Sequence, residues 1–237
     1  MLVTVIGRGH GGTRAMSHTL SDSGVFMGDP LNESGDLLPP RPMYDACRVL
    51  GKHVIYKGNY EWDFSKVLDM EPEQEFVDLI NQYLQSVMSN QSENRGWKLP
   101  ETTLAFPWII KLFPEIKYIQ WVRDPRDSIL KGHPTDDLGR FNIDYDKTDN
   151  IRLSRAISWK YQMEIIKATP KPDNWITVRF EDFVLEQDAT LSRLNDYLGM
   201  DLAKIEVRPK SVGRWKTDTE EHDFDFFQDE LKEHSYK

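Results

Sequence analysis

The chain has 237 residues, of which 39% are hydrophobic and 29% are charged. This length predicts one globular domain over residues 1–237, with an acidic C-terminal segment from 216 to 237. A net charge of −9 argues against general electrostatic binding of nucleic acid, which depends on clustered lysines and arginines. The lone cysteine, Cys47, excludes an intramolecular disulfide, and no apolar run reaches the about 20 residues of a membrane span. We therefore expect a cytoplasmic protein without a membrane partner.

Segments typical of strands and of helices alternate along the chain. Apolar runs predict strands over residues 2–6, 24–29, 117–122 and 174–180. Helical periodicity predicts helices over residues 13–23, 43–50, 73–88, 104–113, 151–167 and 189–198, and a further helix that begins at Pro125. This alternation indicates an α/β fold with a mostly parallel central sheet flanked by helices. Ligands of such sheets bind beyond the carboxyl ends of the strands.

The stretch GRGHGGTR, residues 7–14, joins the first strand to the first helix. Four glycines at this turn permit close approach to the backbone, and the flanking Arg8 and Arg14 indicate an anionic ligand. The glycines also match the G-x-G-x-x-G spacing of dinucleotide-binding folds, which is a weak signal alone. A P-loop that hydrolyses nucleotides has a lysine before its Ser or Thr, whereas a glycine precedes Thr13. A glycine-rich connector with solvated cations is the remaining alternative.

Four further motifs follow in order: GWKLP at residues 96–100, KYIQWVRDPRDSIL at 117–130, VRFEDFV at 178–184 and RPKSVGRWK at 208–216. Together with the opening loop, they resemble the sulfotransferase family that uses 3′-phosphoadenosine 5′-phosphosulfate (PAPS). The resemblance implies a P-loop NTPase-like sulfotransferase fold for the single domain. It also implies transfer of a sulfuryl group from PAPS to a hydroxyl or amine of a small molecule or glycan. The family does this without a metal ion and releases 3′,5′-bisphosphoadenosine (PAP).

The resemblance assigns most of the candidate site to the donor. It implies a loop that binds the 5′-phosphosulfate, formed by Arg8, Gly9, Gly11, Gly12, Thr13 and Arg14. It further implies that Arg123 and Arg208 bind the 3′-phosphate and that Phe180 contacts the adenine. Two positions depart from the family: Lys131 stands where a serine is usual, and Arg214 stands where many members have aspartate. Both are cations that we expect near the donor.

The resemblance also points to catalytic candidates. His10 stands where the family usually has Lys or Arg against the bridging oxygen, so it must be protonated or donate a neutral N–H. Lys98 matches a lysine that lies near the transferred group in the family, although it also fits a surface lysine at a strand end. Glu33 is the leading candidate for the general base, with Asp36 and Glu101 as alternatives. A solvated loop residue is an equal interpretation of Glu33.

Two other functions stay open. A P-loop-type small-molecule kinase explains the opening turn, but it requires ATP, Mg²⁺ and a lysine that this loop lacks. A non-catalytic protein that binds PAPS or PAP explains the missing lysine. The other five histidines show no metal-ligand spacing, so we expect structural or surface roles for them and no metal site. In the acidic segment we expect a terminal helix that docks through Phe224, Phe226, Phe227 and Leu231.

Overall fold

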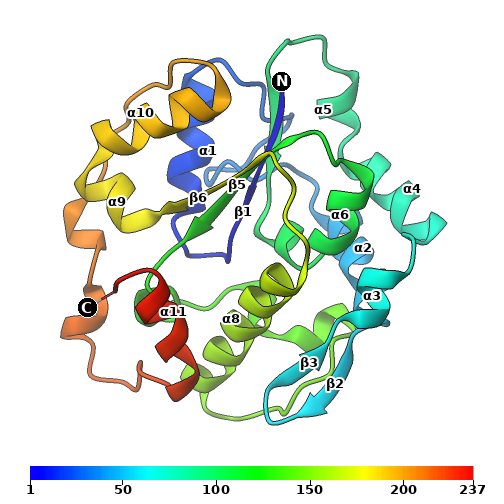
Figure 1. Cartoon of the computed structure of the whole chain (residues 1–237), viewed down its shortest axis with the longest axis vertical. Coiled ribbons are helices and arrows are strands. Elements are labelled where there is room, and N and C mark those ends of the chain that lie inside the picture. The colour runs from blue at the N-terminus through cyan, green and yellow to red at the C-terminus, as the bar shows by residue number, and fades with distance from the viewer. Residues whose placement is uncertain (237) are drawn as a thin grey trace.

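The computed structural model describes residues 1–236 and has a parallel four-stranded sheet at its centre (Figure 1). The strand order is β4-β1-β5-β6, and all three pairings are parallel. The strands are β1 (Leu2–Ile6), β4 (Arg95–Lys98), β5 (Lys117–Val122) and β6 (Trp175–Arg179). The two central strands, β1 and β5, are buried almost throughout, which explains why apolar residues dominate their sequences. The predicted α/β class and the parallel sheet are confirmed.

Three helices cover one face of the sheet and four others contribute to the second core. On the first face lie α1 (Thr13–Asp22), α9 (Phe180–Leu185) and α10 (Gln187–Leu198), which share a core with β1 and β5. The second core is larger and takes in α2 (Arg41–Gly51), α4 (Gln74–Tyr83), α6 (Phe106–Leu112) and α8 (Ile151–Ala168). Figure 1 places α8 and α11 (Gln228–Glu233) beyond the carboxyl ends of the strands. These two helices therefore bound the edge at which ligands of such sheets bind.

The remaining elements are short. They are α3 (Ser65–Asp69), α5 (Gln85–Ser89), α7 (Pro125–Ser128) and an antiparallel hairpin of β2 (Ile55–Gly58) and β3 (Glu61–Asp63). Single 3₁₀ turns span Pro100–Thr103, Pro134–Asp136, Leu138–Phe141, Pro209–Ser211, Arg214–Thr217 and Asp225–Phe227. No helix in residues 1–236 is both long enough and apolar enough to cross a membrane.

Two predicted elements need correction. The strand expected over residues 24–29 is reduced to one isolated parallel bridge between Phe26 and Arg95. Gly24 and Gly28 flank that bridge with φ of 85° and 90°, and such left-handed backbone interrupts an extended strand. The helix expected over 73–88 is interrupted at Leu84, which separates α4 from α5. The other predicted helices have their counterparts in the structure, although α7 has only four residues.

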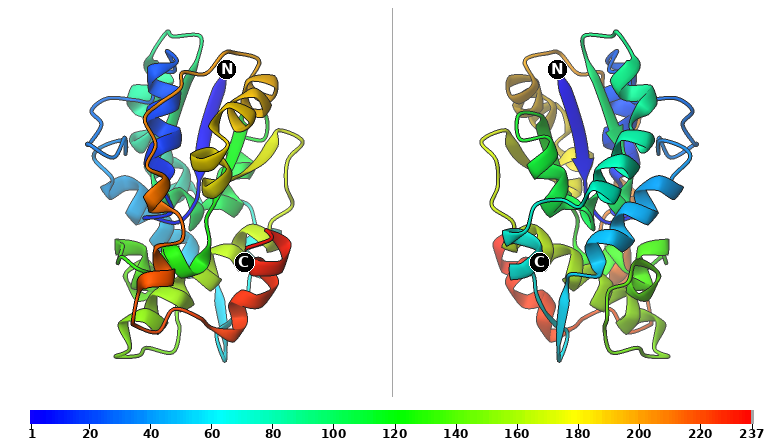
Figure 2. Two further views of the ribbon diagram at one scale, coloured as in Figure 1. Left: turned by 90° about the vertical axis from the view of Figure 1, so that its left-hand side faces the viewer. Right: turned by 90° about the vertical axis from the view of Figure 1, so that its right-hand side faces the viewer.

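The chain after α10 runs along the molecule beside α1 before it reaches α11 (Figure 2). Arg152 on α8 holds its middle part by donating to Asp218 and Glu220, both at 2.6 Å. The expected docking is confirmed for Phe224, Phe227 and Leu231, which are buried, whereas Phe226 is only half-buried. The terminal helix is a short one, and Lys237 lies outside the described residues.

Candidate active site

The turn after β1 presents unused backbone donors. Gly12 precedes α1 in a left-handed conformation, and neither a side-chain cap nor an acidic residue is found in the first helical turn. The Gly11 N–H donates to the carbonyl of Arg8, but the N–H groups of Gly12, Thr13 and Arg14 donate to no group in residues 1–236. A helix N-terminus with free N–H groups carries a partial positive charge and favours an anion. Of the loop residues expected to donate, Gly11 is therefore already engaged.

Two rings determine where glycine is required in this turn. A Cβ on Gly9 would lie 2.1 Å from Cδ2 of His133, and a Cβ on Gly12 would lie 2.5 Å from Cδ2 of Phe180. Both distances are shorter than any contact that a real Cβ makes, so the backbone can come this close to the rings only if residues 9 and 12 are glycines. Phe180, the first residue of α9, thus packs beneath the turn where the adenine-contacting residue was expected.

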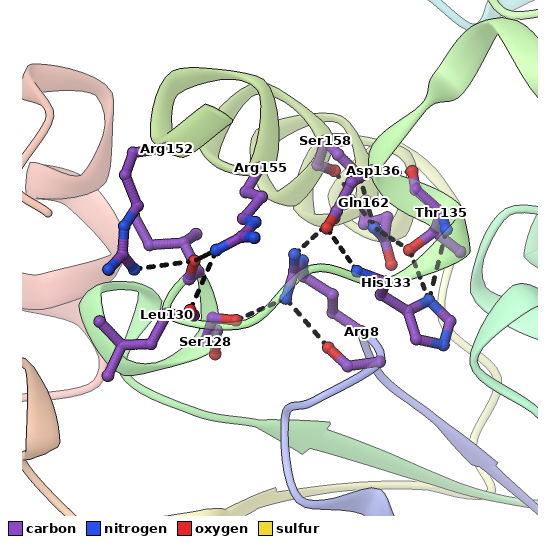
Figure 3. Close-up of polar contacts among 12 residues, drawn as sticks. Arg8, Ser128, Leu130, His133, Thr135, Asp136, Arg152, Arg155, Ser158 and Gln162 are labelled. Atoms are coloured by element: carbon purple, nitrogen blue, oxygen red, sulfur yellow. Dashed lines mark hydrogen bonds and ion pairs between the residues drawn. The ribbon is translucent and has the colours of Figure 1, made fainter. Parts of the chain in front are cut away.

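Arg8 supports the turn from behind (Figure 3). Its guanidinium is buried, donates to the carbonyl of Ser128 at 2.6 Å and forms an ion pair with Asp136. It also donates to the carbonyl of Gly9 at 3.0 Å. These contacts fix the turn against the segment that follows α7. In this conformation Arg8 positions the loop and does not point to open space.

Arg123 joins three separate segments at the end of β5. Its guanidinium donates to the carbonyl of His10 at 3.1 Å, to Oδ2 of Asp127 at 3.0 Å and to the carbonyl of Ser211 at 2.5 Å. It also lies 4.3 Å above the Phe180 ring, which is close enough for a cation–π contact. Burial lowers the pKa of Arg123, while the facing Asp127 carboxylate opposes that shift.

Four other cations expected near the donor form no ion pair within residues 1–236. They are Arg14, Lys131, Arg208 and Arg214; the first three are exposed and the last is half-buried. Beside the larger effect of burial, three of them act electrostatically on residues of the candidate site. Lys131 lowers the pKa of His10, Arg14 lowers that of Lys98, and Arg214 lowers that of Arg123. Arg208 lies three residues before Ser211, whose N–H and hydroxyl donate to its carbonyl.

His10 occupies the tip of the turn with φ of 60°. Its ring lies edge-on to that of His133, with 5.7 Å between the centroids. Partial burial and the nearby Arg8 lower the pKa of His10 below its ordinary value. Both effects favour the neutral imidazole before any ligand binds.

Lys98 and Glu33 belong to the same region but differ in environment. Lys98 at the end of β4 is buried, and its Nζ donates to the carbonyl of Ser34 at 2.7 Å and to Oδ1 of Asp36 at 2.5 Å. Burial lowers the pKa of this lysine. Lys98 thereby anchors the loop after Gly28, the loop that also carries Glu33. Glu33 itself is exposed and forms no hydrogen bond or ion pair with residues 1–236.

Two further residues, Glu101 and His133, lie at this edge of the sheet, and the sequence alone did not place either among the leading candidates. Glu101 is fully buried, neither of its carboxylate oxygens has a well-formed hydrogen bond within residues 1–236, and burial raises its pKa to about 7. His133, expected to be structural or at the surface, lies with Nδ1 4.0 Å from Oε1 of Glu101. The sequence signal for His133 was its position after β5, because ligands of such sheets bind beyond the carboxyl ends of the strands.

A cleft of about 490 Å³ opens beside His133. Its walls come from the segment 132–140 and from the start of α8, and include the charged side chains of Asp136, Asp137, Arg140 and Arg155. The volume is in the range of small-molecule sites. His133 therefore lies between this cleft and the glycine-rich turn.

One group of three potential metal ligands occurs in residues 1–236, formed by Glu230, Glu233 and His234 around α11. Lys167 on α8 forms ion pairs with both carboxylates, at 3.1 Å in the case of Glu233. The lysine ammonium supplies the positive charge that these carboxylates attract. That the protein works without a metal ion stays a prediction.

The parallel sheet, the glycine-rich turn after β1 and the free N–H groups of α1 define a P-loop-like α/β protein with a candidate anion site. The family model described as "Sulfotransferase family" matches residues 4–204. The chain therefore belongs to the sulfotransferase family.

Solved structures agree with this family. The sulfotransferase domain from the curacin biosynthetic pathway has a TM-score of 0.62 at 16% identity, covering 99% of this chain and 97% of that one. The sulfotransferase domain from the Synechococcus PCC 7002 olefin synthase has a TM-score of 0.58 at 20% identity, covering 100% and 94%. A sulfotransferase from Alicyclobacillus acidocaldarius has a TM-score of 0.51 at 11% identity, covering 88% and 87%. At these identities the likeness shows a shared fold. No curated protein matches the chain.

Proposed function

We propose that the protein transfers a sulfuryl group from PAPS to a hydroxyl or amine of a small molecule or glycan, without a metal ion. One observation carries the proposal: the free N–H groups of Gly12, Thr13 and Arg14 lie at a helix N-terminus in a member of the sulfotransferase family. Such a site suits the 5′-phosphosulfate, which is the anionic end of this donor. We further propose a cytoplasmic location, because Cys47 is a free, buried thiol.

The other parts of the donor have candidate partners around the turn. Arg208, Lys131 and Arg214 carry charges that no carboxylate of residues 1–236 neutralises in an ion pair, and we assign them to the 3′-phosphate. Phe180 supplies an aromatic surface for the adenine. Arg123 already donates hydrogen bonds to three segments, so we assign it mainly the role of holding these segments together. Its positive charge also attracts the 3′-phosphate.

The chemistry requires a cation where charge develops. The acceptor oxygen attacks sulfur while the bond between sulfur and the bridging oxygen breaks, and the electron pair stays on the 5′-phosphate of PAP. His10 is exposed at the tip of the turn, and in its protonated form it stabilises the charge on that oxygen. The negative charge of the donor raises the pKa of His10 and so opposes the lowering found in the free protein. Lys98 adds a positive charge at the end of β4, and Glu33 stays the predicted base.

Ligand-dependent thermal stability tests the donor site. PAP should raise the melting temperature strongly, because a ligand at 100 times its Kd adds about 2.7 kcal/mol to the free energy of unfolding. At the same concentration, 5′-AMP should have a much smaller effect, since it lacks the 3′-phosphate. A preference for ATP with Mg²⁺ would favour the small-molecule kinase instead. Equal effects of PAP and 5′-AMP would contradict the assignment of the 3′-phosphate site.

A transfer assay separates an enzyme from a binding protein. Donor labelled in its sulfuryl group is incubated with a panel of phenols, alcohols, amines and oligosaccharides, and labelled products are separated from PAPS. Transfer to at least one class supports the enzyme. Strong PAP binding without transfer to any of them, and without hydrolysis of the donor, would favour the non-catalytic alternative.

A further inference from the structure

A buried carboxyl group lies directly behind an imidazole at the candidate active site. Glu101 follows β4 in the 3₁₀ turn Pro100–Thr103 and is completely shielded from solvent. Its Oε1 is 4.0 Å from Nδ1 of His133. The Tyr44 hydroxyl acts on this carboxyl group, but neither carboxylate oxygen has a hydrogen bond of good geometry within residues 1–236, and such burial of a carboxyl group is costly.

The other edge of the His133 ring faces the glycine-rich turn. A Cβ on Gly9 would lie 2.4 Å from Nε2 of His133, so this nitrogen lies against the backbone of the turn. The ring edge also contacts His10, and the ring lines the 490 Å³ cleft. His133 therefore has Nδ1 4.0 Å from a buried carboxyl oxygen and Nε2 beside the backbone of the glycine-rich turn, in a residue that also lines the cleft.

We propose that His133 is the general base of the transfer, taking the acceptor proton at Nε2, and that Glu101 positions its ring and balances the resulting imidazolium charge. The inference rests on the proposed function and replaces the exposed Glu33 in the role of base. The cleft is then the entrance for the acceptor, since His133 is one of the residues that line it.

The step balances as follows. The acceptor O–H bond breaks and its proton moves to Nε2, while the oxygen forms a bond to sulfur. The bond from sulfur to the bridging oxygen breaks, and its electron pair leaves with PAP. The imidazolium then carries one proton more than the resting ring and returns it to water after product release. In the enzyme form with Glu101 ionised, its carboxylate keeps its charge during the step and stabilises the imidazolium.

The resting tautomer sets a condition for this role. Nε2 is free to accept only when the ring proton is on Nδ1, and Nδ1 then donates to the hydroxyl of Thr135 at 3.0 Å. The N–H of Thr135, 3.3 Å away, competes for the same nitrogen in the other tautomer. An ionised Glu101 favours the proton on Nδ1, because it places a negative charge beside that nitrogen.

Several charged groups face the pair and set its pH dependence. Burial, Arg8, His10 and Lys98 lower the pKa of His133 to about 3, so the resting ring is neutral, and its basicity must be raised by the negative charge of an ionised Glu101 and of the bound donor. Burial and Asp36 raise the pKa of Glu101 to about 7, while Tyr44 and Lys98 act against this. The Cys47 thiol donates to the carbonyl of Glu101 and stays protonated, since burial raises its pKa. Turnover should therefore rise with pH as Glu101 ionises near pH 7.

Two variants test the pair through binding and turnover. His133→Gln should lower turnover roughly 100-fold, as expected on removal of a general base, while the melting shift caused by PAP stays as in the wild type. The reaction followed is release of PAP from labelled PAPS, with water or with any acceptor found in the panel. Glu101→Gln should slow the reaction and remove its rise near pH 7. Glu164→Gln is the matched control, because burial also raises the pKa of that carboxyl group, which is paired with Lys160 on α8.

A structural readout keeps the test independent of acceptor identity. Nitrogen chemical shifts from ¹⁵N-labelled histidine report the tautomer of His133 in the PAP complex, with assignment from the His133→Gln spectrum. We expect Nδ1 to carry the proton, and we expect a shift toward the Nε2–H tautomer in Glu101→Gln. A proton on Nε2 in the wild type, or turnover of His133→Gln within a few-fold of wild type, would overturn the proposal. Failure of PAP to bind would instead count against the proposed function and leave the coupling of His133 to Glu101 measurable.

Discussion

The ring of Phe180 lies against the backbone of Gly12, so that a Cβ at this glycine would be 2.5 Å from Cδ2 of the ring. The same ring lies under the guanidinium of Arg123 at 4.3 Å. One aromatic side chain at the start of α9 therefore supports both the glycine-rich turn and Arg123, the residue that joins this turn to Ser211.

Replacement of Gly12 by alanine should be costly for two separable reasons. The left-handed backbone, with φ of 91°, disfavours any Cβ by about 1 kcal/mol, and the collision with Phe180 adds a packing cost of about 2 kcal/mol. Gly24→Ala has a similar φ of 85° but nothing within 4 Å of its new Cβ, so it should show the backbone term alone. Urea unfolding of both variants measures the difference. Equal losses would mean that the turn and the ring move apart freely.

The buried Asp127 carboxylate should contribute more to stability than the partly exposed one of Asp182. Asp127 is fully buried, pairs with Arg123 and accepts from the N–H groups of Gly213 and Trp215. Asp127→Asn should therefore lower the free energy of unfolding by about 3 kcal/mol. Asp182→Asn breaks a partly exposed pair with Arg179, and should cost under about 1 kcal/mol. Chemical denaturation would contradict this ranking if the two variants lost equal stability.

Arg208 offers a direct test of the 3′-phosphate assignment, because its exposed guanidinium forms no ion pair within residues 1–236. Arg208→Ala should weaken PAP by about 1.5–3 kcal/mol, the range for a hydrogen bond to a charged group. Its effect on 5′-AMP should be small. Arg193→Ala, at an exposed position on α10, serves as the control. Calorimetric titration would refute the assignment if Arg208→Ala weakened both nucleotides by the same factor.

His10 should matter for turnover far more than for affinity if it stabilises the leaving oxygen. His10→Ala should then reduce the rate strongly with little change in PAP binding, because the contact strengthens in the transition state. His10→Lys should restore activity. Wild-type turnover should fall as pH rises through the bound-state pKa of His10, whereas the lysine variant should keep its rate, since lysine titrates much higher. If the turnover of His10→Ala stayed within a few-fold of wild type, other cations would be the ones that stabilise the leaving oxygen.

Glu101 should make the fold less stable as pH rises. The unfolded chain releases this proton near pH 4.5, while the folded protein retains it until about pH 7. The unfolded state therefore binds fewer protons across this window, and the free energy of unfolding falls by about 3 kcal/mol from this group alone. Glu101→Gln removes the effect, so its stability relative to wild type should increase between pH 4 and pH 8. Denaturation curves with a constant difference over that range would show that the carboxyl group titrates normally.

The sequence predicted those parts of the molecule that depend on local pattern. Continuous apolar runs located β1 and β5, and the order of the motifs indicated the family that the comparison shows. A strand was predicted where the structure has only the bridge at Phe26, because a glycine in the sequence permits a left-handed backbone but does not show that one is adopted. The break at Leu84 likewise leaves the apolar spacing of α4 and α5 almost unchanged.

Partnerships across the chain were beyond that pattern. Arg8 looked like a ligand-binding cation, but it pairs with Asp136, which follows it by 128 residues. His133 looked like a surface residue until the fold placed its ring on Gly9. Such contacts depend on how the segments after β1 and β5 meet at one edge of the sheet. Periodicity predicts that they meet, but it does not predict which side chains then touch.

The three contacts of Arg123 also set an order of events during synthesis. β1, β5 and the His10 carbonyl emerge from the ribosome early, whereas Ser211 follows only after most of the chain has been made. A nascent chain that stops after β6 has all four strands of the central sheet, yet it lacks the carbonyl that holds the guanidinium from the third side. Synthesis of the chain after α10, which follows all four strands of the sheet in sequence, is thus what completes the contacts of Arg123 in the newly made protein.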